Sequence, residues 1–236
     1  MQKKLKDYLS QAGLKLNNWK VDEKFIKELE AVFAKKLPNS ARAAGLLSYP
    51  VPKLTPDGSC SLSDELEDEP YDLIASLEYN DVSKEPALKL IYRLNEIVKL
   101  LHQETGADWT GIYRKLNTKS GPALVKLAYT GKPSRAEFLL TPEFAEHSNN
   151  STVGLTGKAV WINSVKEHLQ TGNPYYECDT KVQSELCLPI FSESKQIIGI
   201  IDLESFQEKF FDSQKVINAA IGCIMLAKNI NLKTPY

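Results

Sequence analysis

The feature that most constrains the fold of this chain is a change of hydrophobic periodicity at Gly106. In residues 84–105 the apolar side chains recur every three or four positions, which predicts an amphipathic helix. This stripe consists of Ala87, Ile91, Leu94, Val98 and Leu101. Ser83 is expected to cap the start of the helix and Gly106 to end it. Beyond Gly106 the pattern becomes strand-like, so the helix is expected to pack against a sheet.

Two pairs of strand-like runs follow the helix. Residues 107–116 and 123–130 are expected to pair with each other through the segment between them. Residues 184–191 and 196–204 are apolar runs separated by a short polar turn, which is typical of a hairpin. Between the two pairs lies the segment 131–183, which is long, polar and rich in loop-forming residues. A loop of that length in a compact domain is usually functional.

A last helix is predicted over residues 213–230, with a broad apolar face. We expect it to pack beside the helix at 84–105 and to leave some apolar surface for a partner subunit, as in a homodimer. The order helix, hairpin, irregular segment, hairpin, helix predicts an α+β fold. In such a fold, helices pack on one face of an antiparallel sheet.

The chain divides into an N-terminal helical extension with a connector, residues 1–82, and a domain at 83–236. The extension carries one helical stripe within residues 22–36, formed by Phe25, Leu29, Val32 and Phe33. Prolines and a glycine in residues 38–58 mark a connector. Because the extension has too few apolar residues to form its own core, the helix is expected to dock on the domain or on a second subunit. The helix at 213–230 is the expected receiver.

Composition excludes several classes of function. The chain has 29 basic and 30 acidic residues, and a general nucleic-acid binder would need an excess of basic ones. No apolar run reaches the length of about 18 residues that a membrane crossing requires. The first residues lack the apolar core of a signal peptide, so a cytoplasmic protein is expected.

Cysteines and histidines give no sign of a metal site. The four cysteines form no CxxC pair and are expected to be free thiols in a reducing compartment: Cys60, Cys178, Cys187 and Cys223. The three histidines are scattered. The sequence contains no dinucleotide-binding or phosphate-binding glycine motif either, so no cofactor is expected.

Strand parity places several polar and aromatic side chains on one face of the predicted sheet. Trp109 and Tyr113 share a face of the first strand, and Asp202 and Glu204 share a face of the last. Glu185 lies on the neighbouring strand. Carboxylates that are covered by a loop are costly unless a partner neutralises them. A ligand with a cationic group would reduce that cost.

Cys178 lies in the polar stretch GNPYYECDTKVQSE, just before the strand that carries Glu185. A cysteine is ordinarily a small buried apolar residue, but packing is less natural in such a loop. A thiol beside carboxylates suggests redox or nucleophilic chemistry.

From about Ser83 to Ile230 the chain resembles a GAF domain, and within that superfamily it is most similar to the free methionine-(R)-sulfoxide reductases. The matching pieces are ADWTGIY at 107–113, YTGKP at 129–133, GLTGKA at 154–159, YYECDTKVQSELCLPI at 175–190 and IIGIIDLES at 197–205. The combination of the last two pieces is the most specific part of the resemblance.

The resemblance implies a role for each matching residue. Cys178 matches the cysteine that attacks the sulfoxide sulfur. The carboxylates that hold the substrate and supply a proton match Glu185, Asp202 and Glu204, and Glu185 is the expected acid. Trp109 and Tyr113 match aromatic residues that line the pocket. The implied ligand is therefore a small amino-acid-like molecule, and no cofactor is implied.

The sequence departs from the family at the resolving cysteines, which are replaced here by Arg135 and Thr156. Neither residue can form a disulfide with Cys178, so the resemblance implies that an external thiol is the reductant. The loss also favours an alternative, in which the domain binds an amine-bearing ligand without turnover. A third hypothesis is an interaction protein, in which residues 1–82 are the functional part.

Overall fold

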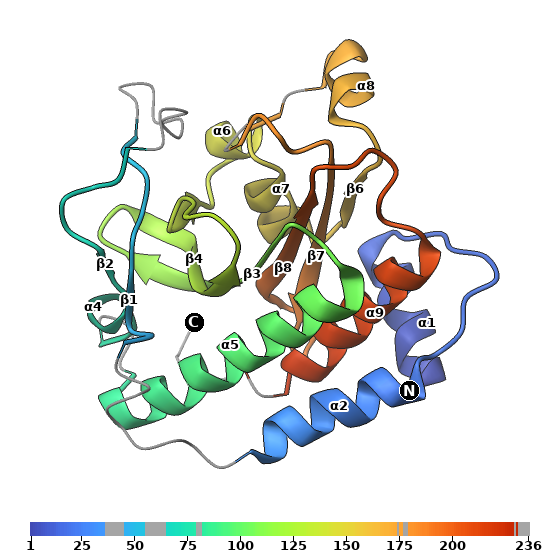
Figure 1. Cartoon of the computed structure of the whole chain (residues 1–236), viewed down its shortest axis with the longest axis horizontal. Helices are drawn as coiled ribbons and strands as arrows, with labels where there is room; N and C mark the ends of the chain where they lie inside the picture. The colour runs from blue at the N-terminus through green and yellow to red at the C-terminus, as the bar shows by residue number, and fades with distance from the viewer. Residues whose placement is uncertain are drawn as a thin grey trace.

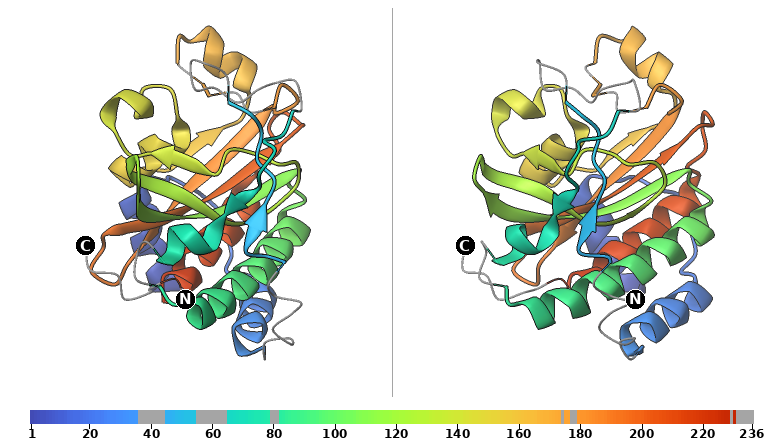
Figure 2. Two further views of the ribbon diagram at one scale, coloured as in Figure 1. Left: turned by 90° about the vertical axis from the view of Figure 1, so that its left-hand side faces the viewer. Right: turned by 60° about the vertical axis from the view of Figure 1, so that its left-hand side comes forward.

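The computed structural model of the chain has an antiparallel sheet between two layers of helices (Figure 1). The structure describes residues 1–35, 45–54, 65–78, 82–173, 175–176, 179–228 and 230. Two long helices, α5 (Lys84–Thr105) and α9 (Ser213–Leu226), pack on one face of the sheet, and the short helix α7 (Asn149–Thr156) packs on the other (Figure 2). None of the helices in these ranges has the length and apolar character that a membrane crossing needs.

Within the described residues the main sheet has six strands in the order β5–β4–β3–β8–β7–β6, and every neighbouring pair is antiparallel. The bounds are β3 (Trp109–Thr118), β4 (Gly121–Thr130), β5 (Glu137–Leu139), β6 (Val160–Ile162), β7 (Ser184–Phe191) and β8 (Ile197–Ser205). Both predicted hairpins are present, although β3 and β4 extend further than expected and meet in a tighter turn. Pairing of β3 with β8 joins the two hairpins and sets Trp109 opposite Glu204.

The predicted helix α5 is confirmed at both ends. Ser83 occupies the N-cap position, although its side chain makes no capping hydrogen bond, and Gly106 follows the last residue with a φ of 70°, a left-handed conformation that glycine adopts at little cost. The last helix, α9, ends at Leu226 and therefore sooner than predicted. Ile230 nevertheless stays buried, and its N–H donates to the Leu226 carbonyl (2.9 Å). The apolar spacing thus continues past the end of the helix.

Two N-terminal helices cover the outer side of α5 and α9. The helix expected within 22–36 is α2 (Glu23–Ala34), whose N-cap Asp22 accepts from the N–H of Phe25. It lies mainly along α5 and only partly on α9, because α1 (Gln2–Ala12) occupies α9. The expectation that α9 is the main receiver of α2 is therefore corrected. Most of the apolar face of α9 is buried against these helices, α5 and β7 of the same chain, while Ile224 and Met225 stay half-buried, and the expected partner subunit stays a prediction.

The connector contains short elements that its prolines did not predict. A small ribbon pairs β1 (Ser48–Tyr49) with β2 (Tyr71–Asp72), and α4 (Leu73–Glu78) follows. The Tyr49 hydroxyl donates to the Lys126 carbonyl (2.7 Å), which fastens the ribbon to β4. The remainder of the expected connector, at 36–44 and 55–64, lies outside the described residues.

The segment 131–183 is more regular than the expected long loop. It contains the edge strands β5 and β6 and three short helices, α6 (Pro142–Ala145), α7 and α8 (Val165–Gln170). Each helix is preceded by a residue whose side-chain hydroxyl accepts a hydrogen bond from a backbone N–H in the first turn. These N-cap residues are Thr141 for α6, Ser148 for α7 and Ser164 for α8. Such short helices have almost no periodic signal, because caps and tertiary contacts stabilise them.

Candidate functional site

Three carboxylates converge on the face of the sheet that α7 covers. Glu185 on β7 lies directly opposite Glu204 on β8. Asp202 stands two residues before Glu204 on the same strand and therefore on the same face of the sheet. All three line one small pocket, together with Phe138, Ser148, Asn149, Asn150 and Tyr176. Its cavity volume is about 20 Å³, which is enough for a single water molecule.

Burial raises the pKa values of two carboxyl groups in this acidic pocket. Glu185 and Asp202 are only 4% and 2% exposed. Burial raises the pKa of Glu185 to about 7, although hydrogen bonds from Tyr175 and Asn149 oppose the shift. Burial, and then the nearby charges of Glu185 and Glu204, raise the pKa of Asp202 well above its usual range. At neutral pH the three carboxyl groups therefore do not all carry a charge.

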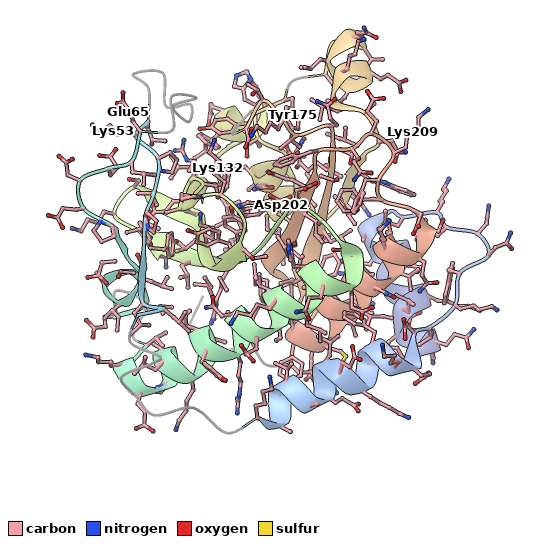
Figure 3. All side chains as sticks on the ribbon, in the orientation of Figure 1. Lys53, Glu65, Lys132, Tyr175, Asp202 and Lys209 are labelled. Atoms are coloured by element: carbon pink, nitrogen blue, oxygen red, sulfur yellow. The ribbon has the colours of Figure 1, made fainter. Side chains whose placement is uncertain are left out.

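Tyr175 and Tyr176 cover the acidic pocket from the segment before β7. Figure 3 labels Asp202 on the sheet and Tyr175 in the segment above it. Burial, and then the charges of Glu185 and Glu204, raise the pKa of Tyr175 well above 10, so its hydroxyl keeps the proton that it donates to Glu185. The ring of Tyr176 packs against Phe138, with ring centres 6.0 Å apart.

Two asparagines that the sequence analysis missed complete the pocket. The Asn149 amide donates to Glu185 (3.3 Å), and the Asn150 amide donates to Asp202 (3.1 Å). Both stand in the first turn of α7, within a segment that was expected to be a loop. The sequence offered one signal for the start of this helix, because Ser148 is a favourable N-cap residue. An N-cap residue does not indicate in which direction the side chains that follow it point.

Trp109 and Tyr113 lie on the same sheet face as the carboxylates, in an aromatic cluster beside the pocket. They are 5% and 1% exposed, and neither borders the pocket cavity. The Trp109 indole donates to the Lys132 carbonyl (3.0 Å), while Tyr113 packs edge-on against Phe138 at 5.5 Å between ring centres. Since Phe138 does border the pocket, the cluster supports its wall from behind.

Two glycines make room for the Trp109 ring. A Cβ atom added at Gly131 would lie 2.6 Å from Trp109 Cδ1, and one added at Gly111 would overlap the far edge of the indole. Gly111→Ala is therefore expected to displace the ring and to lower the free energy of unfolding by about 1–3 kcal/mol, as overpacking does. Urea unfolding and near-ultraviolet circular dichroism measure both effects. Gly45→Ala is the matched control, because a Cβ atom there meets nothing within 4 Å; an equal loss in the two variants would contradict this account of Gly111.

Cys178 lies outside the described residues, as does Cys60. Two near neighbours of Cys178 in sequence contact the site region. Tyr176 borders the acidic pocket, and Asp179 forms an ion pair with Lys132 (3.7 Å). Lys132 is the residue whose carbonyl accepts from Trp109. The segment around Cys178 is thus tied at both sides to groups that surround the pocket.

The two positions that lack the expected cysteines have other roles here. Arg135 donates to the Tyr176 hydroxyl (2.9 Å), and its guanidinium lies 4.8 Å from the Phe144 ring centre. It therefore braces the aromatic side of the pocket. Thr156 ends α7, and its exposed hydroxyl donates to the Thr152 carbonyl (2.7 Å).

The described cysteines, Cys187 and Cys223, are buried free thiols. Cys187 lies opposite Asp202, and burial, followed by that carboxylate, raises its pKa well above the usual range. A thiol of this kind is unreactive. Across the described ranges no group of histidine, cysteine and carboxylate side chains is arranged to hold a metal ion.

Larger cavities lie away from the carboxylates. One of about 290 Å³ separates residues 51–54 from β5, and it contains the hydrogen bond from Tyr71 to Glu137 (2.5 Å). Its walls are mostly apolar. The acidic pocket is much smaller, but it alone among these described cavities gathers three carboxylates, two of them buried, and this makes it the candidate site.

Comparisons with known proteins agree with this architecture. Residues 90–217 match the sequence model of the GAF domain. No curated protein matches the chain. A solved structure of a type II free methionine-R-sulfoxide reductase from Thermoplasma acidophilum is 19% identical, with a TM-score of 0.52 over 61% of this chain and 93% of the other. A free methionine-R-sulfoxide reductase from Neisseria meningitidis, solved with its substrate, is 18% identical, with a TM-score of 0.50 over 62% and 90%. Identities as low as those of the two reductases show a shared fold alone. The GAF sequence model, by contrast, matches more than half of the chain, so the chain belongs to the GAF domain family.

Proposed function

We propose that this GAF-domain protein binds a small amino-acid-like molecule in the acidic pocket and reduces free methionine sulfoxide through Cys178, with an external thiol as reductant. The observation that carries the proposal is the convergence of three carboxylates on a pocket whose described lining contains no lysine, arginine or histidine. Buried carboxylates without a cation are costly, and the ammonium group of a free amino acid would offset that cost.

The proposed roles follow from the chemistry of the groups. Asp202 and Glu204 hold the substrate ammonium, and the aromatic cluster of Trp109 and Tyr113 backs the wall that receives the methyl group. Glu185 has a pKa of about 7 and is therefore partly protonated at neutral pH, as a general acid must be. Because the cavity has room only for water, the substrate enters after Tyr175 and Tyr176 move aside.

The proposed reaction transfers oxygen from substrate sulfur to enzyme sulfur. The Cys178 thiolate attacks the sulfoxide sulfur and forms a sulfur–sulfur bond, while Glu185 protonates the sulfoxide oxygen. The resulting hydroxyl group then moves to the Cys178 sulfur as the sulfur–oxygen bond of the substrate and the sulfur–sulfur bond break. The substrate leaves as the thioether, reduced by two electrons, and Cys178 is oxidised to a sulfenic acid. Two equivalents of an external thiol then reduce the sulfenic acid, releasing water and a disulfide.

Turnover of free L-methionine-(R)-sulfoxide is the direct test. We expect slow formation of methionine with dithiothreitol or glutathione, and little with thioredoxin alone, because Arg135 and Thr156 cannot resolve the intermediate. Cys178→Ser is expected to abolish the product, which chromatography quantifies. Cys223→Ser is the matched control, because that thiol is buried under α1 next to Tyr8. Methionine formation that survives Cys178→Ser would rule out the mechanism.

The second candidate function is a binding module without turnover. Two observations favour it: Arg135 is built into the aromatic wall through Tyr176, and the cavity has a volume of only about 20 Å³. This candidate predicts that methionine sulfoxide or a related amino acid binds, as calorimetry would show, while no thiol supports product formation. Product formation with any thiol would exclude it.

A further inference from the structure

Asn149 and Asn150 are neither charged nor reactive, yet they contact the two most buried carboxylates of the acidic pocket. Asn150 is itself only 6% exposed. A carboxylate oxygen accepts hydrogen bonds, so each amide must direct its NH₂ group at the acid, and the distances to Glu185 and Asp202 are 3.3 and 3.1 Å. Both hydrogen bonds depend on the position of the first turn of α7 relative to the sheet.

The position of α7 is fixed at both ends. Ser148 caps its start by accepting the N–H of Ser151 (3.2 Å). Further along, Gly154 lets the helix approach the sheet closely, since a Cβ atom there would lie 2.7 Å from Leu140 and 2.9 Å from Leu124. The two amides are therefore presented to the carboxylates from a rigid element.

The two oxygens of Asp202 differ in their surroundings. Oδ2 accepts from Asn150, whereas Oδ1 is buried and no side chain among the described residues donates to it. The backbone N–H of Leu203 also favours the charged form of this carboxylate. A buried acceptor without a donor is rare in folded proteins and destabilises them. Because Asn150 occupies Oδ2, Oδ1 is the carboxylate oxygen that is left to accept a further N–H.

We propose that Asn149 and Asn150 are positioning residues that orient Glu185 and Asp202, leaving Asp202 Oδ1 as the acceptor for a single primary ammonium group. This inference rests on the proposed function, because it concerns the same pocket. It adds a basis for selectivity: a primary ammonium can donate to Oδ1, and a trimethylated nitrogen of equal charge cannot.

The surrounding charges make these amides important for protonation as well. Burial opposes the ionisation of Asp202 first, and the charges of Glu185 on β7 and Glu204 on its own strand oppose it next. Cys187, which also faces Asp202 from β7, is a neutral thiol because burial raises its pKa. Tyr175, which lies over the pocket, is bonded to Glu185. From α7, Asn150 donates the side-chain hydrogen bond that favours the charged form of Asp202. Loss of that donor is therefore expected to leave Asp202 protonated up to a higher pH.

The experiment compares Asn150→Leu, which keeps the approximate volume and removes the donor, with the wild type. Carboxyl ¹³C titration without ligand should show an upward shift of the Asp202 pKa in the variant. Calorimetry with free L-methionine sulfoxide should show affinity reduced about tenfold or more at pH 7, with recovery as the pH rises. For the wild type, the N,N,N-trimethyl derivative should bind about tenfold or more weakly than the parent amino acid.

Thr152→Val is the matched control, because Thr152 stabilises the same helix by donating to the Ala145 carbonyl (2.7 Å) and touches no carboxylate. It should leave the titration and the affinity unchanged. If Asn150→Leu does not fold, Asn150→Ser provides the same test with a side chain too short to reach Asp202. An unshifted Asp202 titration, or equal binding of the trimethyl derivative, overturns the inference. If the wild-type protein binds no amino acid at any pH while Asn150→Leu still shows the upward shift of the Asp202 titration, the proposed function is overturned and the positioning role is supported.

Discussion

Deletion of residues 1–35 is expected to leave a chain that does not fold to a stable soluble protein. The two helices in this stretch bury seven large apolar side chains on α5 and α9: Leu5, Tyr8, Leu9, Phe25, Ile26, Leu29 and Val32. At about 1.5–3 kcal/mol for each buried side chain, their contribution is comparable to the whole free energy of unfolding of a typical domain, about 5–15 kcal/mol. The deletion also exposes the apolar faces that these residues cover.

Solubility, size-exclusion chromatography and urea unfolding of the truncated chain measure this effect. Single substitutions give a graded version, since Leu5→Ala and Phe25→Ala should each cost about 2–5 kcal/mol. Lys24→Ala is the control, because it alters an exposed side chain of α2 whose ion pair with Glu28 is also exposed. A truncated chain as stable as the full chain would show that residues 1–35 are dispensable for folding, and would leave room for the hypothesis that they serve an interaction instead.

Glu185→Gln is expected to stabilise the protein at alkaline pH while it removes the proposed acid. The pKa of Glu185 is about 7 in the folded protein, against about 4.5 for an ordinary glutamate. Between these values the folded chain binds more protons than the unfolded chain, so stability falls as the pH rises from about 4.5 to about 7 and then levels off. The difference corresponds to roughly 2–4 kcal/mol. Glutamine has no charge to bury, so the variant avoids that loss.

Urea unfolding at pH 4.5 and pH 8 provides the measurement. The variant should gain stability relative to wild type at pH 8 and lose most of that advantage at pH 4.5. Glu193→Gln, in the exposed turn between β7 and β8, should reproduce the wild-type pH profile. The same Glu185→Gln protein should form no methionine from the sulfoxide. Equal stability of variant and wild type at both pH values would show that the pKa of Glu185 is not raised in the folded protein.

Much of the scaffold of the site was predictable from strand and helix periodicity. The alternation in 184–191 and 196–204 is regular, so parity alone places Glu185 on the same face as Asp202 and Glu204. The helix stripe and Gly106 locate α5 to the residue. Both patterns are local, and the sheet and helices follow them closely.

The rest of the site depends on contacts that periodicity does not encode. Asn149 and Asn150 stand in a short helix held by a cap and by packing on Leu124, and no strand parity applies to them. Trp109 shares the predicted face but lies beside the pocket, because Gly111 and Gly131 allow its ring to lie flat against the backbone. The docking of α2 on α5 also followed from competition with α1 for α9, which is a tertiary effect. The division of the chain at residue 82 and the chemical roles of the site residues stay predictions.

The docking of α1 has a consequence for synthesis on the ribosome. Tyr8 donates to the carbonyl of Pro189 (2.8 Å), and α1 packs on α9, so α1 is synthesised well before the elements that it packs against. At about 5–20 residues per second, the apolar side of α1 waits roughly 10–40 s before α9 exists. During that interval the apolar side of α1 lacks the α9 surface that covers it in the folded protein.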